Sequence, residues 1–150
     1  MDDTDLKILR ILQEDSAISM VDLALKVGLS HTPCWRRVKQ LEESGAIRGR
    51  AVLLDARIMG LTVNVLANIK LKAHDEETLE AFEQAALERP EIVECFVTGG
   101  DSDYAVRIVV GSIEDYERLL KKVLLHFPGV GSVNSHFALK CVKNTTKLPI

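Results

Sequence analysis

The chain has 150 residues, of which 47% are hydrophobic and 27% are charged, and its formal net charge is −3 at pH 7. This composition is ordinary for folded globular proteins and excludes long disordered stretches, and the length suits one domain or two small ones. There is no apolar run of about 18 residues, the length a transmembrane helix needs. The N-terminal sequence MDDTDLK is acidic, where a secretory signal would be basic and then apolar. We therefore expect a cytoplasmic protein with no membrane segment.

Charge is distributed unevenly along the chain. Residues 1–22 contain two basic and six acidic side chains, a net charge of −4, whereas residues 31–50 contain five basic and two acidic ones, a net charge of +3. The acidic total argues against a protein that coats nucleic acid indiscriminately. A short basic segment in an acidic chain is typical of a protein that touches DNA over a small footprint.

The residues that most often build disulfides and metal sites are scattered. The cysteines are odd in number and form no CxxC pair, which excludes a disulfide framework and a cysteine-built zinc site. The histidines have no metal-ligand spacing either. We therefore predict no metal site, and we expect all three cysteines to be reduced and buried. The residues considered are Cys34, Cys95, Cys141, His31, His74 and His126.

The N-terminal part of the chain predicts three short helices. Leucines and isoleucines recur at helical spacing within residues 6–12, behind acidic residues that suit a helix start. Ser19-Met-Val-Asp22 resembles a capping box, with aspartate in place of glutamate, and Gly28 ends the second helix. Ser30 opens the third helix, and Pro33 falls in its first turn, where a missing N–H costs nothing.

Two short helices joined by Gly28-Leu29-Ser30 and packed on a preceding helix form a helix-turn-helix. We assign residues 1–46 to this DNA-binding domain. Residues 47–61 are predicted to be a hinge strand and linker. Within this segment Ile47–Leu54 is β-like, as a strand or a small wing.

From residue 62 the pattern alternates between strands and helices, and we assign residues 62–150 to a second domain. The order β-α-β-β-α-β predicts a ferredoxin-like arrangement, an antiparallel sheet with both helices on one face, so the fold class of the chain is α+β. The predicted elements are strands at Thr62–Leu71, Ile92–Thr98, Tyr104–Val110 and Val133–Val142, a helix at Glu76–Arg89, and a helix capped by Ser112 that ends near Pro128-Gly129.

The other face of this sheet is predicted to be uncovered. Two helices cannot cover all the apolar side chains of the strands, among them Val93, Cys95 and Val97. A sheet that is apolar on both sides usually packs against another copy of itself. We therefore expect a homo-oligomer.

The third helix carries the candidate DNA-binding residues. If Cys34, Val38 and Leu41 face the core, hydroxyl, imidazole and cationic groups project from the other side, where the N-terminal turns of such a helix enter the major groove. The alternative is a solvated amphipathic helix. Trp35 has two interpretations, stacking near the DNA backbone or packing beside the core. The predicted DNA-binding residues are Ser30, His31, Thr32, Trp35, Arg36 and Lys39.

Residues 16–54, and especially LALKVGLSHTPCWRRVKQLEESGAI, resemble the DNA-binding half of the leucine-responsive regulator/asparagine regulator (Lrp/AsnC, or feast/famine) family. The resemblance continues in GGDSDY at 99–104, in LLHFPGVGSVNSHFALK at 124–140 and in KNTTKLPI at the end. It implies a helix-turn-helix, a hinge strand and a βαββαβ sensing domain that dimerises through its sheet. It also implies dimers that assemble into tetramers or octamers, and an amino acid or related metabolite bound between sensing domains.

The resemblance places the effector at the Gly100–Tyr104 turn and at the segment around Ser132 to His136. The chemistry fits an amino acid, because the amides of Gly99-Gly100 suit a carboxylate and Asp101 or Asp103 suits an ammonium group. The alternative is a tight turn that needs these residues only for its own conformation. The expected effector-binding residues are Gly100, Asp101, Asp103, Tyr104, Ser132, Asn134, Ser135 and His136.

The sequence thus predicts a DNA-binding transcriptional regulator that responds to an amino acid and has no cofactor, with double-stranded DNA and its own copies as partners. Two alternatives remain. A siroheme decarboxylase-like enzyme of the same architecture would need Arg and His groups converging on a large pocket. An architectural DNA-compacting protein would not need the sensing turn. No Ser-His-Asp order, phosphate loop or pair of catalytic carboxylates is evident, and we predict no catalytic residues.

Overall fold

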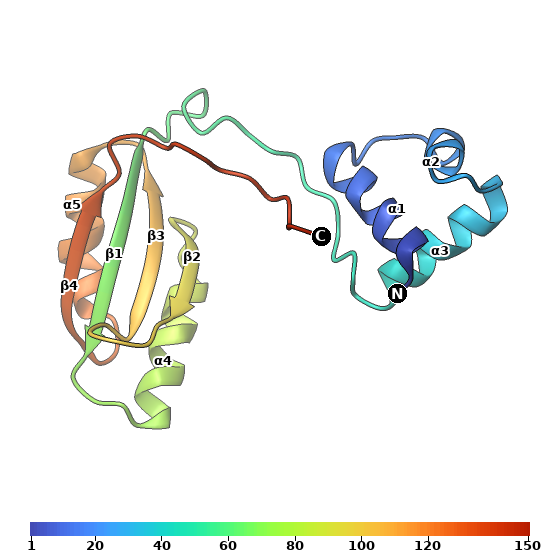
Figure 1. Ribbon diagram of the computed structural model, residues 1–150. Helices are drawn as coiled ribbons and strands as arrows, with labels where there is room; N and C mark the ends of the chain where they lie inside the picture. Colours follow the sequence, from blue (N-terminus) through green and yellow to red (C-terminus); the bar gives the residue numbers. More distant parts are fainter. The chain divides into compact units, whose positions relative to one another are not determined.

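The computed structural model describes residues 1–150 and consists of two compact units (Figure 1). The helical unit comprises residues 1–53 together with 142–150, and the sheet unit comprises residues 54–141. The sequence division at residue 62 leaves the last nine residues in the second domain, whereas the structure groups them with the helices. The reason is that these residues bond to α1 and not to the sheet.

The helical unit contains α1 (Asp3–Glu14), α2 (Met20–Val27) and α3 (His31–Glu43). Asp2 and Asp5 cap α1 reciprocally, since each carboxylate accepts the backbone N–H of the other residue at 2.9 Å. Ser19 caps α2, and Gly28 ends it in the left-handed conformation, φ 73°, which glycine adopts without steric cost. Ser30 precedes α3 as predicted, but its hydroxyl makes no capping bond. The buried core of this unit is Ile8, Leu23, Ala24, Val27, Cys34, Val38 and Leu41.

The segment after α3 forms no strand in the single chain, so the prediction of a strand or wing at Ile47–Leu54 is not met by the structure of one subunit. After a turn at Ser44–Gly45, the backbone runs without regular structure until a turn at 56–60. A strand needs a neighbour to complete its hydrogen-bond ladder, and this segment pairs with none. Val52, Leu53 and Leu54 are consequently more than two-thirds exposed.

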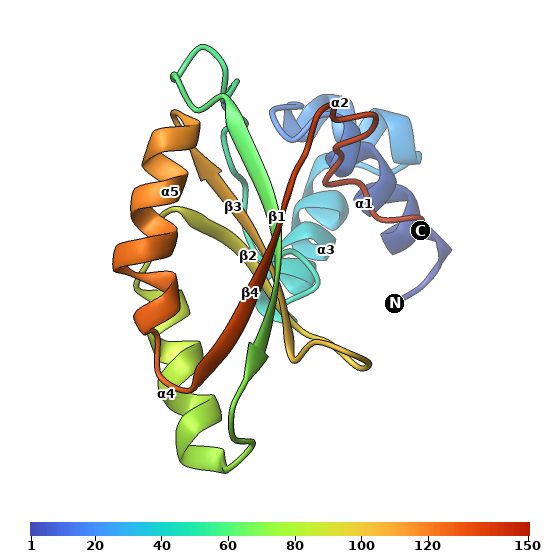
Figure 2. The ribbon, with the colours of Figure 1, turned by 90° about the vertical axis from the view of Figure 1, so that its left-hand side faces the viewer.

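The sheet unit has the predicted βαββαβ order, and its strands lie in the order β2-β3-β1-β4 with every neighbouring pair antiparallel. Both long helices cover the same face of the sheet (Figure 2). The α+β, ferredoxin-like prediction is confirmed. The elements are β1 (Val63–Leu71), α4 (Glu76–Leu87), β2 (Ile92–Val97), β3 (Tyr104–Val110), α5 (Ile113–Lys122), a short 3-10 turn (Leu124–His126) and β4 (Val130–Phe137).

The last strand begins and ends earlier than predicted. β4 pairs only with β1, from Leu71 opposite Val130 to Val65 opposite Phe137. One further bond joins the Ala138 N–H to the Asn64 carbonyl oxygen, 2.9 Å away. The alternating residues that follow lie beyond the end of β1 and therefore have no strand to pair with.

Strict alternation along β1 and β3 builds the core of the sheet unit. The buried members are Val65, Ala67, Ile69 and Leu71 on β1 and Tyr104, Val106, Ile108 and Val110 on β3. They face α4 and α5. The Phe82 ring of α4 packs on the Tyr104 ring with centroids 4.3 Å apart.

Two of the three residues named for the open-face prediction, Cys95 and Val97, lie on the helix-covered face, and the third, Val93, falls in a bulge of β2. Cys95 pairs with Val106 and Val97 with Tyr104, so both belong to the helix-covered face and are exposed only because β2 is an edge strand. The open face instead presents Leu66, which is 50% exposed, and Phe96, which is 60% exposed.

The three cysteines are free, as predicted, but only Cys34 is buried. Cys95 is exposed because it lies on the edge strand, and Cys141 is exposed because it follows the end of the sheet. None of the helices combines the length and apolar character needed to cross a bilayer.

Candidate DNA-binding helix and effector-binding sheet

The third helix presents its polar side to solvent as the sequence predicts. Cys34, Val38 and Leu41 are buried, which confirms the predicted inner face. The six predicted DNA-binding residues are all exposed: Ser30, His31, Thr32, Trp35, Arg36 and Lys39. Gln40, one turn after Arg36, is exposed on the same side of the helix, although it is not among the predicted residues.

The two adjacent arginines of α3 have different environments. The guanidinium of Arg37 contacts Asp2 Oδ2 at 2.8 Å and Asp5 Oδ1 at 2.7 Å, and so joins α3 to the capping box of α1. The Asp5 N–H and then Arg37 hold the pKa of Asp2 below its ordinary value, while Asp5 and then Asp2 raise the pKa of Arg37. Arg36 makes no ion pair within the chain. Its charge therefore remains available to a partner.

Trp35 does not belong to the core. The residue is 47% exposed, and the Lys39 ammonium lies 5.2 Å from the ring centroid, a cation–π arrangement. Lys39 also approaches the Glu43 carboxylate at 3.9 Å, a weak contact on an exposed helix surface. The outer side of α3 thus combines an aromatic ring with two cations, Arg36 and Lys39.

The hairpin between β2 and β3 contains the predicted glycine-aspartate turn. Gly100 has φ 113°, a conformation that side-chain-bearing residues rarely adopt. The turn is closed by the Thr98 N–H donating to the Asp103 carbonyl oxygen at 2.9 Å. The amides of Gly99, Gly100 and Asp101 make no hydrogen bond within the chain, and the Asp101 carboxylate is exposed and unpaired. These groups are free for an external partner.

Asp103 is occupied by the protein itself. Its Oδ2 accepts the Leu71 N–H at 2.7 Å, and its Oδ1 lies 2.8 Å from His74 Nε2. These groups, the Leu71 N–H first, hold the pKa of Asp103 below its ordinary value. Asp103 therefore joins the hairpin to the end of β1, and the sequence did not signal the role of His74.

The residues expected on β4 divide between the two faces of the sheet. Ser132, Asn134 and His136 are exposed on the open face, across β1 from Lys70, Asn68 and Leu66. Ser135 points to the other face, where its hydroxyl bonds to the Tyr116 hydroxyl.

Tyr104 also faces the helices. It is 1% exposed, and its hydroxyl donates to Glu83 Oε1 at 2.8 Å. Burial, with Glu83 as a second cause, raises the pKa of Tyr104. The eight predicted effector residues therefore do not converge on one pocket within a subunit. Tyr104 of β3 and Ser135 of β4 face the helices, whereas Ser132, Asn134 and His136 lie on the opposite face of the sheet.

The register shows which of these residues lie near the hairpin. Ile69 pairs with Tyr104 on one side and with Val133 on the other, so the turn and Ser132 lie at the same end of the sheet with β1 between them. Two strand spacings amount to roughly 10 Å. Asn134 and His136 lie progressively farther along β4. Within one chain, only Ser132 approaches the level of the turn.

A helix-turn-helix with an exposed basic face, joined to a ferredoxin-like sheet unit, is the architecture of a DNA-binding regulator with a separate ligand-binding domain. Residues 64–148 match the model of the Lrp/AsnC ligand binding domain, and residues 1–48 match a winged helix-turn-helix DNA-binding model. The chain belongs to the Lrp/AsnC family of DNA-binding transcriptional regulators.

Curated relatives align over the whole chain. The Bkd operon transcriptional regulator of Pseudomonas aeruginosa is 39% identical over all of this chain and 98% of its own length. The glutamate uptake regulatory protein of Zymomonas mobilis is 38% identical, covering all of this chain and 91% of the relative.

Solved structures agree with the fold. An AsnC family regulator from Agrobacterium tumefaciens is 45% identical, with a TM-score of 0.94 over 99% of this chain and 97% of the other. A regulator from Neisseria meningitidis, solved in complex with L-Met, is 34% identical, with a TM-score of 0.95 over 99% and 96% of the two chains.

The bond between Asp103 and Leu71 predicts a pH-dependent contribution to stability. Because the folded-state pKa of Asp103 is lowered, its contribution is complete above the unfolded-state pKa of about 4 and is lost as the pH falls through the folded-state value. Asp103→Asn should therefore be less stable than wild type at neutral pH, and the difference should shrink in acid. Urea unfolding at a series of pH values, followed by the near-UV circular dichroism of Tyr104 and Tyr116, measures this.

Asp101→Asn is the matched control, because the Asp101 carboxylate has no partner in the same turn. It should leave the free energy of unfolding close to that of wild type throughout. A stability difference for Asp103→Asn that does not change between neutral and acidic pH would contradict the assignment.

Proposed function

We propose that this regulator reads DNA with the exposed face of α3 and changes its DNA affinity when an amino acid or related metabolite binds the sheet unit. The observation that carries the DNA-binding part is the unpaired charge of Arg36 on the exposed side of α3, beside Lys39 and Trp35. His31 and Thr32 occupy the first turn of the helix, the part that reaches base edges in helix-turn-helix complexes. Ser30 precedes them with a hydroxyl that is free to bond a phosphate.

The adjacent arginines provide a test of the DNA-binding face. Arg36→Ala and Lys39→Ala should each weaken binding to a duplex selected from a random-sequence pool by the wild-type protein. If the lost contact is to a phosphate, the slope of log K against log salt should fall by about 0.9. Arg37→Ala should instead lower the thermal midpoint, because it releases Asp2 and Asp5. Fluorescence anisotropy and thermal denaturation measure the two effects.

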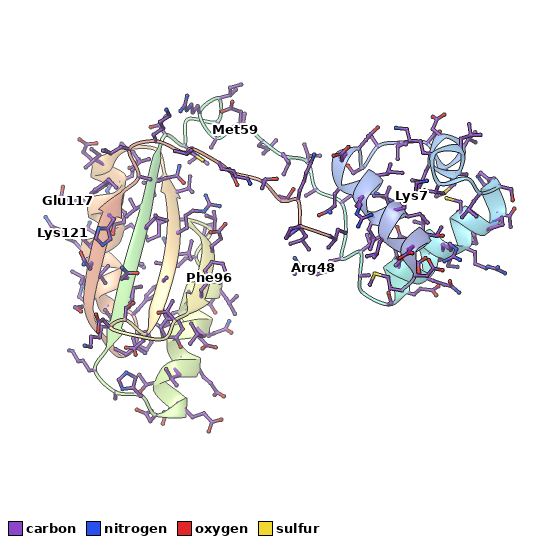
Figure 3. All side chains as sticks on the ribbon, viewed as in Figure 1. Lys7, Arg48, Met59, Phe96, Glu117 and Lys121 are labelled. Carbon is purple, nitrogen blue, oxygen red and sulfur yellow. The ribbon has the colours of Figure 1, made fainter.

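Lys7→Ala controls for the loss of one positive charge, since Lys7 is exposed on α1 without a partner (Figure 3). The assignment of α3 fails if the Arg36→Ala/Lys39→Ala protein binds the selected duplex as tightly as the Lys7→Ala protein.

We place the effector carboxylate at the free amides of Gly99, Gly100 and Asp101, and its ammonium group at the Asp101 carboxylate. An amino acid needs N–H donors for one end and an acceptor for the other, and this turn offers both. The relative solved with L-Met supports an amino acid as the ligand class. Ser132, Asn134 and His136, exposed on the open face, are proposed to complete the site from a neighbouring subunit.

Asp101→Ala should abolish binding of the effector and leave DNA binding without effector unchanged. The effector used is whichever of the twenty amino acids most raises the thermal midpoint of the wild-type protein, because a ligand that binds only the folded state stabilises it. A coupling of about 1–3 kcal/mol corresponds to a change in DNA affinity of roughly 5- to 150-fold, and this change should disappear in the variant. Calorimetry that finds wild-type effector affinity for Asp101→Ala would place the pocket elsewhere.

We propose further that the open face of the sheet joins copies of the chain into a dimer, which assembles into tetramers or octamers. Leu66 and Phe96 are exposed on that face (Phe96 is labelled in Figure 3), and β3, which carries Ala105, lies between their strands. Val109 lies on the same face at the far end of β3, and the remaining residues are mostly polar and include the ion pair of Arg107 with Glu94 at 3.0 Å. Such a mixed surface suits an interface with a small apolar centre and a polar rim.

Phe96→Arg should reduce the mass measured by light scattering at micromolar concentration, because it places a charge at the centre of the proposed interface. Val97→Arg is the matched control: it changes the next residue of the same edge strand, which is 73% exposed but belongs to the other face. If both variants keep the mass of the wild-type protein, and that mass exceeds a monomer, the interface lies elsewhere.

We assign the protein no catalytic role and no cofactor. The curated relatives are named as regulators, and the exposed basic helix would have no use in a tetrapyrrole-processing enzyme. The sensing turn distinguishes the chain from a purely architectural DNA-compacting protein. A DNA-binding regulator acts on the chromosome, so we place it in the cytoplasm at the nucleoid.

A further inference from the structure

The last residues of the chain bind along α1 of the helical unit. The Arg10 Nε donates to the Ile150 main-chain oxygen at 2.8 Å. The Gln13 side-chain amide holds Leu148 from both sides: its oxygen accepts the Leu148 N–H at 2.6 Å, and its nitrogen donates to the Leu148 carbonyl at 3.3 Å. The Gln13 amide thus satisfies both backbone groups of Leu148, as a paired residue in a neighbouring β-strand would.

A charged contact adds to these bonds. Lys147 Nζ lies 3.3 Å from the Glu14 carboxylate, so three consecutive polar positions of α1's outer side, Arg10, Gln13 and Glu14, contact the same segment. The segment 142–150 belongs to the helical unit by its contacts although it follows the sheet unit in the chain. We call it the tail.

The tail is anchored at its other end to the strand that carries the candidate effector residues. β4 ends at Phe137, and the Ala138 N–H still bonds to the Asn64 carbonyl of β1. Residues 139–147 then lead to the Gln13 anchor without helix or strand. The chain therefore joins the two units twice, through this segment and through the linker after α3.

We propose that the tail is a strap that couples the sheet unit to the helix-turn-helix. A single flexible linker leaves two units free to reorient, whereas a second attachment at a different point restricts the orientations available to both. A shift in the position of Ser132 to His136 on β4 then moves the tail relative to α1, and α1 contacts α3 through the ion pairs of Arg37. The proposal deepens the proposed function, because it supplies the path by which an effector would alter DNA binding.

Coupling between two sites is reciprocal, so it can be tested from the DNA side without an effector. Hydrogen exchange of the full-length protein is measured with and without a duplex selected from a random-sequence pool by the wild-type protein. In the wild-type protein, DNA should change the exchange rate of β4 amides, and the Leu148 amide should be protected in both states. In the Arg10→Ala/Gln13→Ala variant, Leu148 should lose its protection and the DNA-dependent change in β4 should disappear, while the DNA affinity stays close to that of wild type.

Lys7→Ala is the matched control, since it removes a cation from α1 that makes no hydrogen bond or ion pair with the tail, and it should behave as wild type. Leu148→Pro is a second variant, which removes the N–H that Gln13 accepts without altering α1. The proposal is overturned if β4 in the wild-type protein does not respond to DNA, or if it responds equally when the tail is released. It is also overturned if the Leu148 amide is unprotected in the wild-type protein, or if it stays protected in the Arg10→Ala/Gln13→Ala variant. For Leu148→Pro, which has no amide at this position, the readout is the response of β4 to DNA. A loss of DNA binding by Arg36→Ala/Lys39→Ala would still support the proposed function in any of these cases.

Discussion

The central position of β1 is the constraint on which the sheet unit depends. β1 pairs with β3 on one side and with β4 on the other, so both strands of the second βαβ half are held by this one strand of the first half. The register of both pairings decides which residues share a level and a face. It sets the β2–β3 turn and Ser132 at the same end of the sheet, and it turns Ser135 and Tyr104 toward the helices. Because side chains alternate with a period of two, a shift of one residue in either pairing would reverse these assignments.

In the helical unit, the adjacent residues Arg36 and Arg37 of α3 take different roles because they lie on different sides of the helix. Successive positions on a helix differ by about 100° around its axis, so neighbours in sequence lie on different sides. Arg37 turns toward α1 and is neutralised by the two aspartates of the capping box, while Arg36 remains exposed without a partner. The acidic N-terminal segment therefore stabilises the position of α3 and leaves its outward charge intact. A charge count along the chain does not separate these two roles.

The helical unit is built from both ends of the chain. Its three helices enclose a small core of seven buried residues, and domains of this size bury a comparatively small fraction of their surface. The tail adds hydrogen bonds to the outer side of α1 and joins the unit to the end of β4. The contacts that stabilise the helical unit are therefore the same contacts through which the proposed strap would act.

The sequence by itself determined the helices of the first unit, the order of elements in the second and the exposed side of α3. Each of these depends on local signals: apolar spacing, Ser19 and Gly28 at helix ends, and β-branched runs bounded by turns. Tertiary structure alone decided that Asp103 is held by Leu71 and His74, that Cys95 and Val97 face the helices, that residues 47–54 form no strand and that the tail returns to α1. These depend on pairing between residues that are far apart in the chain, or on the lack of a pairing partner, and no periodicity within a short segment encodes that.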